Sequence, residues 1–240
     1  MNATRPYFLP CKEAVGYIKR ELSFEWYPGF SLIQHQRSLV AFHDAIKQNE
    51  KEPFEILDVS TKSVFPLGVQ LSALNLSIPI KSLNGKLVSV ENIFQCSKVF
   101  GNHEVKVGPF VEFLESDPKQ VKKKIQQKLD EFAKEHGIAK VSQMEIVGFS
   151  QNGHEYALEP KEGFYFFLYC HALRSFFDHH PKLFEECKRY SAFTDITFNP
   201  TKSLNCQAAA LAFYLSLKPS DVIRLLKEPP LFLNVLKLSQ

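Results

Sequence analysis

The chain has 240 residues, of which 45% are hydrophobic and 23% charged, and its net charge is +3. These proportions are ordinary for a globular protein with a buried core, and they exclude a disordered or fibrous chain. The five cysteines are odd in number and widely spaced, which argues against a disulfide framework or a zinc site.

The first 50 residues predict an N-terminal helical extension. Apolar residues recur at helical spacing over residues 12–22 and again over residues 32–48. The sequence Tyr-Pro-Gly-Phe at residues 27–30 separates the two stretches and is a turn signal. Lys-Glu-Pro at residues 51–53 ends the second predicted helix.

The pattern then changes to that of strands. Strands are predicted over residues 54–59, 78–80 and 87–88. Asn84-Gly85 lies between the last two, and this pair flanked by apolar runs is a strong signal for a hairpin. Helical spacing returns over residues 89–100.

The second half of the chain predicts mainly helices. Asp117 as a cap and Pro118 at the first helical position begin the clearest one, which Gly137 ends. Further helices are predicted over residues 162–178, 181–189, 204–217 and 220–227, and strands over residues 145–149 and 193–198. Because no repeat or linker interrupts this order, we predict a single α+β domain over residues 1–240, mostly helical with a small sheet or hairpin.

The chain shows no sign of export or of metal binding. Its N-terminus lacks the basic and then apolar pattern of a secretion signal, and the longest apolar run is too short to span a bilayer. His171, His179 and His180 have no convincing metal-ligand spacing with acids or cysteines. We therefore expect a cytoplasmic protein with no membrane segment, no metal and no other cofactor.

The predicted helix over residues 89–100 carries a polar stripe. Glu91, Gln95 and Lys98 are spaced by four and three residues, so they fall on one helix face. A stripe of this kind can be an ordinary solvated face with a weak Glu–Gln contact. The preceding residues 71–76 mix small and polar side chains with apolar ones, as a chain does when it passes close to a ligand.

These two segments together resemble the NADAR family. Its members carry a small-residue segment with an asparagine, then a hairpin, then a helix that reads roughly Val-Glu-x-x-Phe-Gln-x-x-Lys. The corresponding parts here are Ser72-Ala73-Leu74-Asn75, the turn at Asn84-Gly85, and residues 90–98. The match in residue type, order and spacing is good.

A second stretch resembles one subgroup of that family. Residues 192–207 are similar to the C-terminal signature of NADAR antitoxins found beside DNA-modifying ADP-ribosyltransferase toxins. Other bacterial members end in an Asp-x-x-Trp-Gly-type motif, of which this chain has Asp195 but no Trp-Gly. The resemblance covers about residues 26–217.

The resemblance implies an N-glycosidase, here an ADP-ribosylglycohydrolase that removes ADP-ribose from guanine bases of DNA. Such an enzyme would act as the antitoxin to an ADP-ribosyltransferase toxin, with ADP-ribosylated DNA or ADP-ribose as its ligand. Two alternatives stay open. One is an N-glycosidase on a phosphorylated metabolite of the riboflavin pathway, and the other is a module that binds ADP-ribose without turnover.

Three residues are candidates for the chemistry. Cleavage of an N-glycosidic bond passes through a state with positive charge on the sugar, which a carboxylate stabilises. Glu91 is the first candidate for that carboxylate and Asp195 the second. Lys98 either neutralises and orients Glu91, or attacks the anomeric carbon and forms a Schiff base with the opened sugar.

Further polar residues are candidates for substrate contact. Lys202, Ser203 and Asn205 stand at the start of a predicted helix, whose free N–H groups suit a pyrophosphate, although Ser203 or Asn205 would serve equally as a cap. The remaining candidates, for the ribose or the base edge, are Ser72, Asn75, Gln95, Asn199 and Gln207. The lysine run over residues 119–128 is a solvated face or a contact for a DNA backbone.

Overall fold

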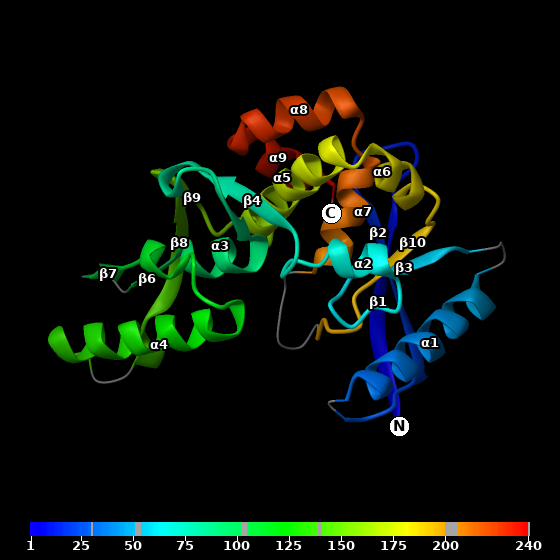
Figure 1. The fold of residues 1–240 in the computed structure, drawn as a ribbon, viewed down its shortest axis with the longest axis horizontal. Coiled ribbons are helices and arrows are strands. Elements are labelled where there is room, and N and C mark those ends of the chain that lie inside the picture. The colour runs from blue at the N-terminus through cyan, green and yellow to red at the C-terminus, as the bar shows by residue number, and fades with distance from the viewer. Residues whose placement is uncertain (30, 51–53, 102–104, 139–140, 200–205, 240) are drawn as a thin grey trace.

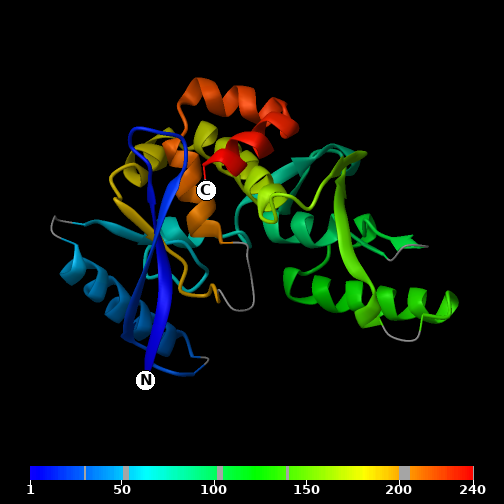
Figure 2. The same ribbon diagram turned by 180° about the vertical axis from the view of Figure 1, so that it is seen from behind.

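The computed structural model describes residues 1–29, 31–50, 54–101, 105–138, 141–199 and 206–239. These residues form an α+β fold in which helices outweigh the strands, as the sequence predicts. Two groups of elements lie on either side of the long helix α5 (Gly163–His179), as Figure 1 and the reverse view in Figure 2 show. None of the helices described is both long and apolar enough to cross a membrane.

One group is built on a four-stranded sheet with the order β2-β1-β10-β3. The strands are β1 (Asn2–Pro10), β2 (Tyr17–Glu25), β3 (Ile56–Asp58) and β10 (Ala192–Thr194). β1 pairs antiparallel with β2 and with β10, and β10 pairs parallel with β3. Residues from the two ends of the chain therefore share one sheet.

The predicted helix over residues 12–22 is wrong. Every residue of β2 faces a residue of β1 across a nine-residue antiparallel hairpin, so long-range pairing overrides the local helical spacing. Gly16, just before β2, has a φ of 144°, which a helix does not allow. The N-terminal extension over residues 1–50 is therefore helical only in α1 (Leu32–Asn49), where the prediction is confirmed.

Helix α1 covers this sheet. Its first turn is closed by a capping box between Ser31 and Gln34. Leu39, Phe42 and Ile46 lie one helical turn apart, are fully buried, and pack in a cluster with side chains of β1 and β2. The short helix α2 (Pro66–Gln70) follows β3.

The second group contains the predicted hairpin and the helix that carries the polar stripe. β4 (Ser77–Ile80) pairs antiparallel with β5 (Lys86–Ser89), and Asn84 and Gly85 take the left-handed conformation between them, which confirms the prediction. β5 leads directly into α3 (Val90–Cys96), because Ser89 ends the strand and caps the helix by accepting from the N–H of Asn92.

Helix α3 is shorter than predicted. It ends at Cys96, and Lys98 begins the strand β6 (Lys98–Gly101). A strand replaces the end of the predicted helix because β6 is paired on both sides, with β7 (Lys106–Val107) and β8 (Glu145–Gln151). The sheet has the order β7-β6-β8-β9, and β9 (His154–Tyr156), which was not predicted, forms a hairpin with β8.

The predicted helices of the second half are confirmed over the described residues, and the predicted start of the helix over residues 204–217 lies partly outside them. Asp117 caps α4 (Pro118–Glu135), which buries Val121, Ile125 and Leu129. The other described helices are α6 (Pro181–Cys187), α7 (Gln207–Ser216), α8 (Pro219–Lys227) and α9 (Pro229–Leu238). Short 3-10 turns occupy Lys81–Leu83, Val111–Phe113 and Val141–Gln143. α5 and α7 are almost wholly buried, and one hydrophobic cluster runs from β1 through α5 and α7 to α3 and α4.

We expect Phe42→Ala to destabilise the fold by about 3 to 5 kcal/mol, because it empties a site that is only 1% exposed between α1 and the sheet. Val40 on the same helix is 51% exposed, so Val40→Ala should change the free energy of unfolding by no more than about 0.5 kcal/mol. Urea unfolding of both variants measures the difference. Equal losses would mean that α1 does not pack as described.

Candidate active site

Three polar side chains of the predicted stripe form a continuous chain of hydrogen bonds. Gln95 donates through Nε2 to Oε1 of Glu91 at 3.0 Å, and Nζ of Lys98 donates to Oε1 of Gln95 at 2.6 Å. The spacing survives the end of the helix because Ser97 keeps a helical backbone conformation. The amide of Gln95 therefore separates the carboxylate from the amine.

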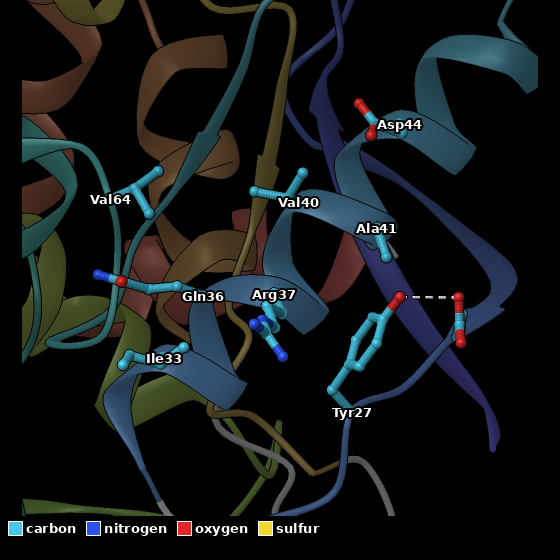
Figure 3. Close-up of a pocket in the computed structure, with 9 residues that line it drawn as sticks. Tyr27, Ile33, Gln36, Arg37, Val40, Ala41, Asp44 and Val64 are labelled. Atoms are coloured by element: carbon cyan, nitrogen blue, oxygen red, sulfur yellow. Dashed lines mark hydrogen bonds between the residues drawn. The ribbon is translucent and has the colours of Figure 1, made fainter.

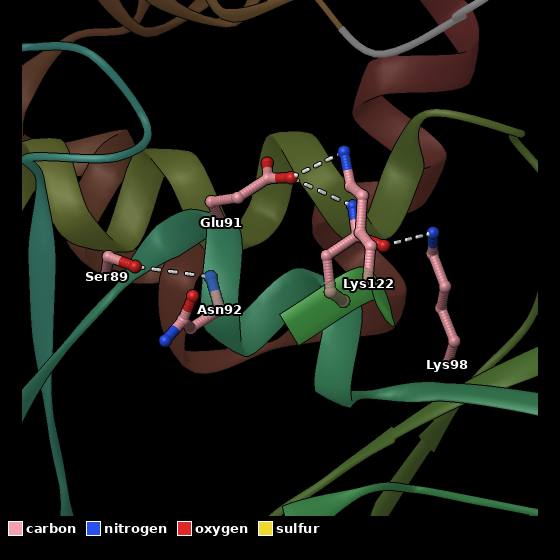
Figure 4. A network of polar contacts seen from close by, with 6 residues as sticks. Ser89, Glu91, Asn92, Lys98 and Lys122 are labelled. Atoms are coloured by element: carbon pink, nitrogen blue, oxygen red, sulfur yellow. Dashed lines mark hydrogen bonds and ion pairs between the residues drawn. The ribbon is translucent and has the colours of Figure 1, made fainter. Parts of the chain in front are cut away.

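The cation that contacts Glu91 directly is Lys122 of α4. Its Nζ lies 3.0 Å from Oε1 of Glu91, and Figure 4 shows the two side chains meeting. Lys122 is 67% exposed and Glu91 21% exposed, so the pair lies at the protein surface, where such pairs stabilise the fold little. Sequence reasoning placed Lys122 only in a lysine run, since no spacing rule links residues on two different helices.

Lys98 is held in an environment that disfavours its charge. Burial is the main cause that lowers the pKa of its amine to about 8, while the charge of Glu91 opposes the shift and that of Lys122 adds to it. The ammonium also lies 4.9 Å from the centre of the Phe94 ring. At pH 7.5 roughly a quarter of such amines are neutral and able to act as nucleophiles.

Asp195 lies at the end of β10, where its carboxylate turns the chain. Its Oδ1 accepts from the N–H of Thr197 at 3.0 Å, from the hydroxyl of Thr197 at 2.6 Å and from the N–H of Phe198 at 3.1 Å. Burial raises the pKa of Asp195 to about 6. The predicted strand over residues 193–198 ends at Thr194 because this turn follows.

Gln207 connects the two candidate carboxylates. Its Nε2 donates to Oδ2 of Asp195 at 3.0 Å, and its Oε1 accepts from the N–H of Ala73 at 2.7 Å. The C=O of Ala73 accepts in turn from the N–H of Glu91 at 2.9 Å. The structure therefore brings Glu91, Gln207 and Asp195 into one network, although they lie far apart in the sequence.

Tyr165 of α5 also belongs to this region. Burial raises the pKa of its phenol well above the usual value, and the negative charges of Glu91 and Asp195 raise it further, so both carboxylates act on the phenol. Its ring contacts that of Phe94 edge-on at 5.2 Å. Nothing in the sequence distinguishes Tyr165 from its neighbours, because it stands within a run of aromatic residues.

The other residues predicted to contact the substrate lie in different parts of the chain, and some lie outside the described residues. Ser72 and Asn75 both donate to the C=O of Val69, at 2.7 Å each, and so fold the turn that presents Ala73. Asn199 is half-buried after the turn at Asp195. Three of the candidates, namely Lys202, Ser203 and Asn205, lie outside the residues that the structure describes. Direct contact of any of these side chains with a substrate stays a prediction.

A second buried carboxyl group, that of Asp58, lies next to the turn at Asp195. Asp58 accepts from the hydroxyl of Ser60 at 2.6 Å, from the N–H of Ile196 at 2.8 Å and from the hydroxyl of Thr194 at 3.1 Å. Burial raises the pKa of Asp58 to about 7, with a further contribution from the charge of Asp195. Sequence reasoning missed this role, because Asp58 stands in an ordinary strand pattern.

A separate cavity of about 790 Å³ lies beside α1 and contains none of the candidate residues (Figure 3). It is lined by Glu25, Tyr27, Ile33, Gln36, Arg37, Val40, Ala41, Asp44 and Val64.

Among the residues described, no group of three or more histidine, cysteine or acidic side chains is placed to hold a metal ion. The candidate active site therefore consists of the carboxylates, the amine and the phenol around Glu91.

Comparison with known proteins supports the resemblance seen in the sequence. A family model described as the DarT1-associated NADAR antitoxin matches residues 3–240, nearly the whole chain. No curated protein matches the chain. The match extends past the segment over residues 26–217 on which the resemblance was first based.

We expect Asp58 to contribute less stability to the fold as the pH rises from about 4 to about 7. Its folded-state pKa is about 7, raised from 3.8, so in that window this carboxyl group binds more protons in the folded protein than in the unfolded chain. The buried His43, whose pKa is lowered to about 3, acts in the opposite direction, so each variant is compared with the wild type. Asp58→Asn removes the Asp58 contribution, so its thermal midpoint should rise relative to that of the wild type as the pH increases. Asp130→Asn, at an exposed position on α4, should keep the wild-type slope. Three parallel slopes would contradict the assignment.

Proposed function

We propose, from the premise that the chain belongs to the family of DarT1-associated NADAR antitoxins, that it removes ADP-ribose from guanine bases of DNA. The family supports an antitoxin role and a hydrolase of the glycosidase type. An antitoxin implies a toxin whose product it reverses. The choice of ADP-ribosyl-guanine in DNA as the substrate is our proposal. The groups around Glu91 support the reaction, which is cleavage of an N-glycosidic bond.

The observation that carries the proposal is the state of Lys98. An amine that served only to neutralise Glu91 would contact that carboxylate, yet Lys122 makes the contact and Gln95 separates Lys98 from it. Burial also lowers the pKa of Lys98 to about 8. Both features suit a nucleophile better than a counter-ion, so they favour the second of the two roles considered for Lys98.

In the proposed reaction the neutral amine of Lys98 attacks the anomeric carbon of the ribose. A bond from the Lys98 nitrogen to that carbon forms, and the bond from the carbon to the guanine nitrogen breaks. The proton that the amine gives up goes to the departing guanine. The sugar ring then opens to a Schiff base, which water hydrolyses to release ADP-ribose and to restore the amine.

The other groups of the site have supporting roles in this proposal. Glu91 supplies the negative charge that stabilises the positive charge on the sugar during bond cleavage. Gln95 orients the amine by accepting from it at 2.6 Å. Asp195 supports the site indirectly and does not contact the sugar. Its Oδ1 already accepts three hydrogen bonds, and its Oδ2 accepts from Gln207.

We expect the wild-type protein to release ADP-ribose from an oligonucleotide that carries ADP-ribosylated guanine, and Lys98→Met to slow release by about 10²-fold or more. Lys98→Arg should fail equally, because a guanidinium keeps the charge but forms no Schiff base. Cyanoborohydride should trap a covalent adduct on the wild type only. Lys128→Met, at an exposed position on α4, is the matched control and should keep the wild-type rate.

Two results would redirect the assignment. Binding of ADP-ribose with no release by the folded protein would indicate a binding module. Turnover of a phosphorylated riboflavin-pathway metabolite, with none on the oligonucleotide, would indicate a metabolic N-glycosidase.

We expect the single-turnover rate to rise with pH and to level off above about 8, because only the neutral form of Lys98 attacks. The charge of Lys122 is one cause of the lowered pKa, so Lys122→Gln should move the profile to higher pH. Stopped time courses from about pH 6 to pH 9.5 measure both profiles. A rate that falls as the pH rises would show that Lys98 acts as a cation instead.

A further inference from the structure

The positive charge of α4 is concentrated in its N-terminal half. The lysines there are Lys119, Lys122, Lys123 and Lys124, and Lys128 follows just past the middle of the helix. No acidic residue lies between Pro118 and Lys128, whereas Asp130, Glu131 and Glu135 follow in the C-terminal half. The two halves of one helix therefore differ sharply in charge.

This arrangement does not help the helix to form. The N-terminal end of a helix carries a partial positive charge, so cations are disfavoured there. Lys119 and Lys123 are four residues apart, as are Lys124 and Lys128, and like charges at this spacing repel each other. The exposed ion pair between Lys122 and Glu91 offsets little of that cost. Folding therefore does not account for the cluster, and an anionic ligand would.

Helix geometry divides the lysines into two sets. At 100° per residue, Lys119, Lys122 and Lys123 follow one another around one side of α4, the side on which Lys122 contacts Glu91. Lys124 and Lys128 lie on the opposite flank, across the buried face of the helix. There Lys124 donates to the hydroxyl of Ser116 at 3.0 Å and lies over the Phe113 ring. Only the first set adjoins the candidate active site.

Each member of the first set is exposed, and Lys122 is paired with Glu91 at the surface. Lys119, Lys122 and Lys123 are all exposed, and residues one helical turn apart project side by side about 5 to 6 Å apart. Lysine ammonium groups on flexible stems bind phosphates as point charges without reading a base.

We infer that Lys119, Lys122 and Lys123 bind the phosphate backbone of the nucleic-acid strand that carries the modified base. The identity of the ligand as DNA rests on the proposed function. In this arrangement a phosphate replaces Glu91 as the partner of Lys122, so binding of the strand frees the carboxylate beside Lys98. The backbone contact holds the strand next to the site and leaves recognition of ADP-ribose to the residues around Glu91.

The experiment is binding of a fluorescent, unmodified single-stranded oligonucleotide by the full chain, measured by anisotropy over a range of salt concentrations. The test variant is Lys119→Glu/Lys123→Glu. The matched control is Lys128→Glu/Lys134→Glu, which makes the same change in net charge on the same helix. Glutamate suits the N-terminal half of a helix, so the test variant should fold, and thermal unfolding verifies it.

We expect the test variant to bind at least about tenfold more weakly, and its plot of log affinity against log salt to be shallower by roughly 1 to 2. The control should lose less than about threefold. Equal losses in the two double variants, or no binding by the wild type in about 50 mM salt, would overturn the inference. Equally strong competition by polyglutamate would also overturn it, in favour of an acidic protein surface. Because no ADP-ribose is present, the result does not depend on whether the protein hydrolyses it.

Discussion

The side chain of Gln207 is the constraint on which the candidate site depends. Its amide has one arrangement that satisfies both neighbours, with Nε2 toward the carboxylate of Asp195 and Oε1 toward the N–H of Ala73. These bonds join α7, the turn after β10 and the segment before α3. Because the group is buried, loss of either bond would leave a polar atom without a partner at considerable cost. The backbone that positions Glu91 is thus fixed from the far end of the chain.

Burial sets the electrostatic character of the region around that amide. It lowers the pKa of Lys98 and raises those of Asp195 and Asp58, so each group moves toward its neutral form near physiological pH. The reaction proposed for this site needs groups that can exchange protons near that pH. The exposed Lys122 forms an ion pair with Glu91.

Local signals in the sequence predicted much of the fold and part of the site. The hairpin at Asn84-Gly85, the capped helix from Asp117 and the spacing of Glu91, Gln95 and Lys98 are all encoded within a few residues, and the structure bears them out. β2 was predicted as a helix because its partner β1 was not recognised as a strand. The roles of Lys122, Tyr165 and Asp58 depend on contacts between distant elements, which spacing along one element does not reveal.

The junction at Ser97 limits where insertions can change the length of the chain. The C=O of Ser97 accepts from the N–H of Ser150 at 2.7 Å, and that of Cys96 accepts from the N–H of Phe110 at 2.7 Å, so the end of α3 is held on both sides. One inserted residue here would turn Lys98 to the opposite face of β6, away from Gln95. The loop between β4 and β5 has no such restriction. Homologous chains should therefore differ in length at that loop and keep the number of residues between Glu91 and Lys98 constant.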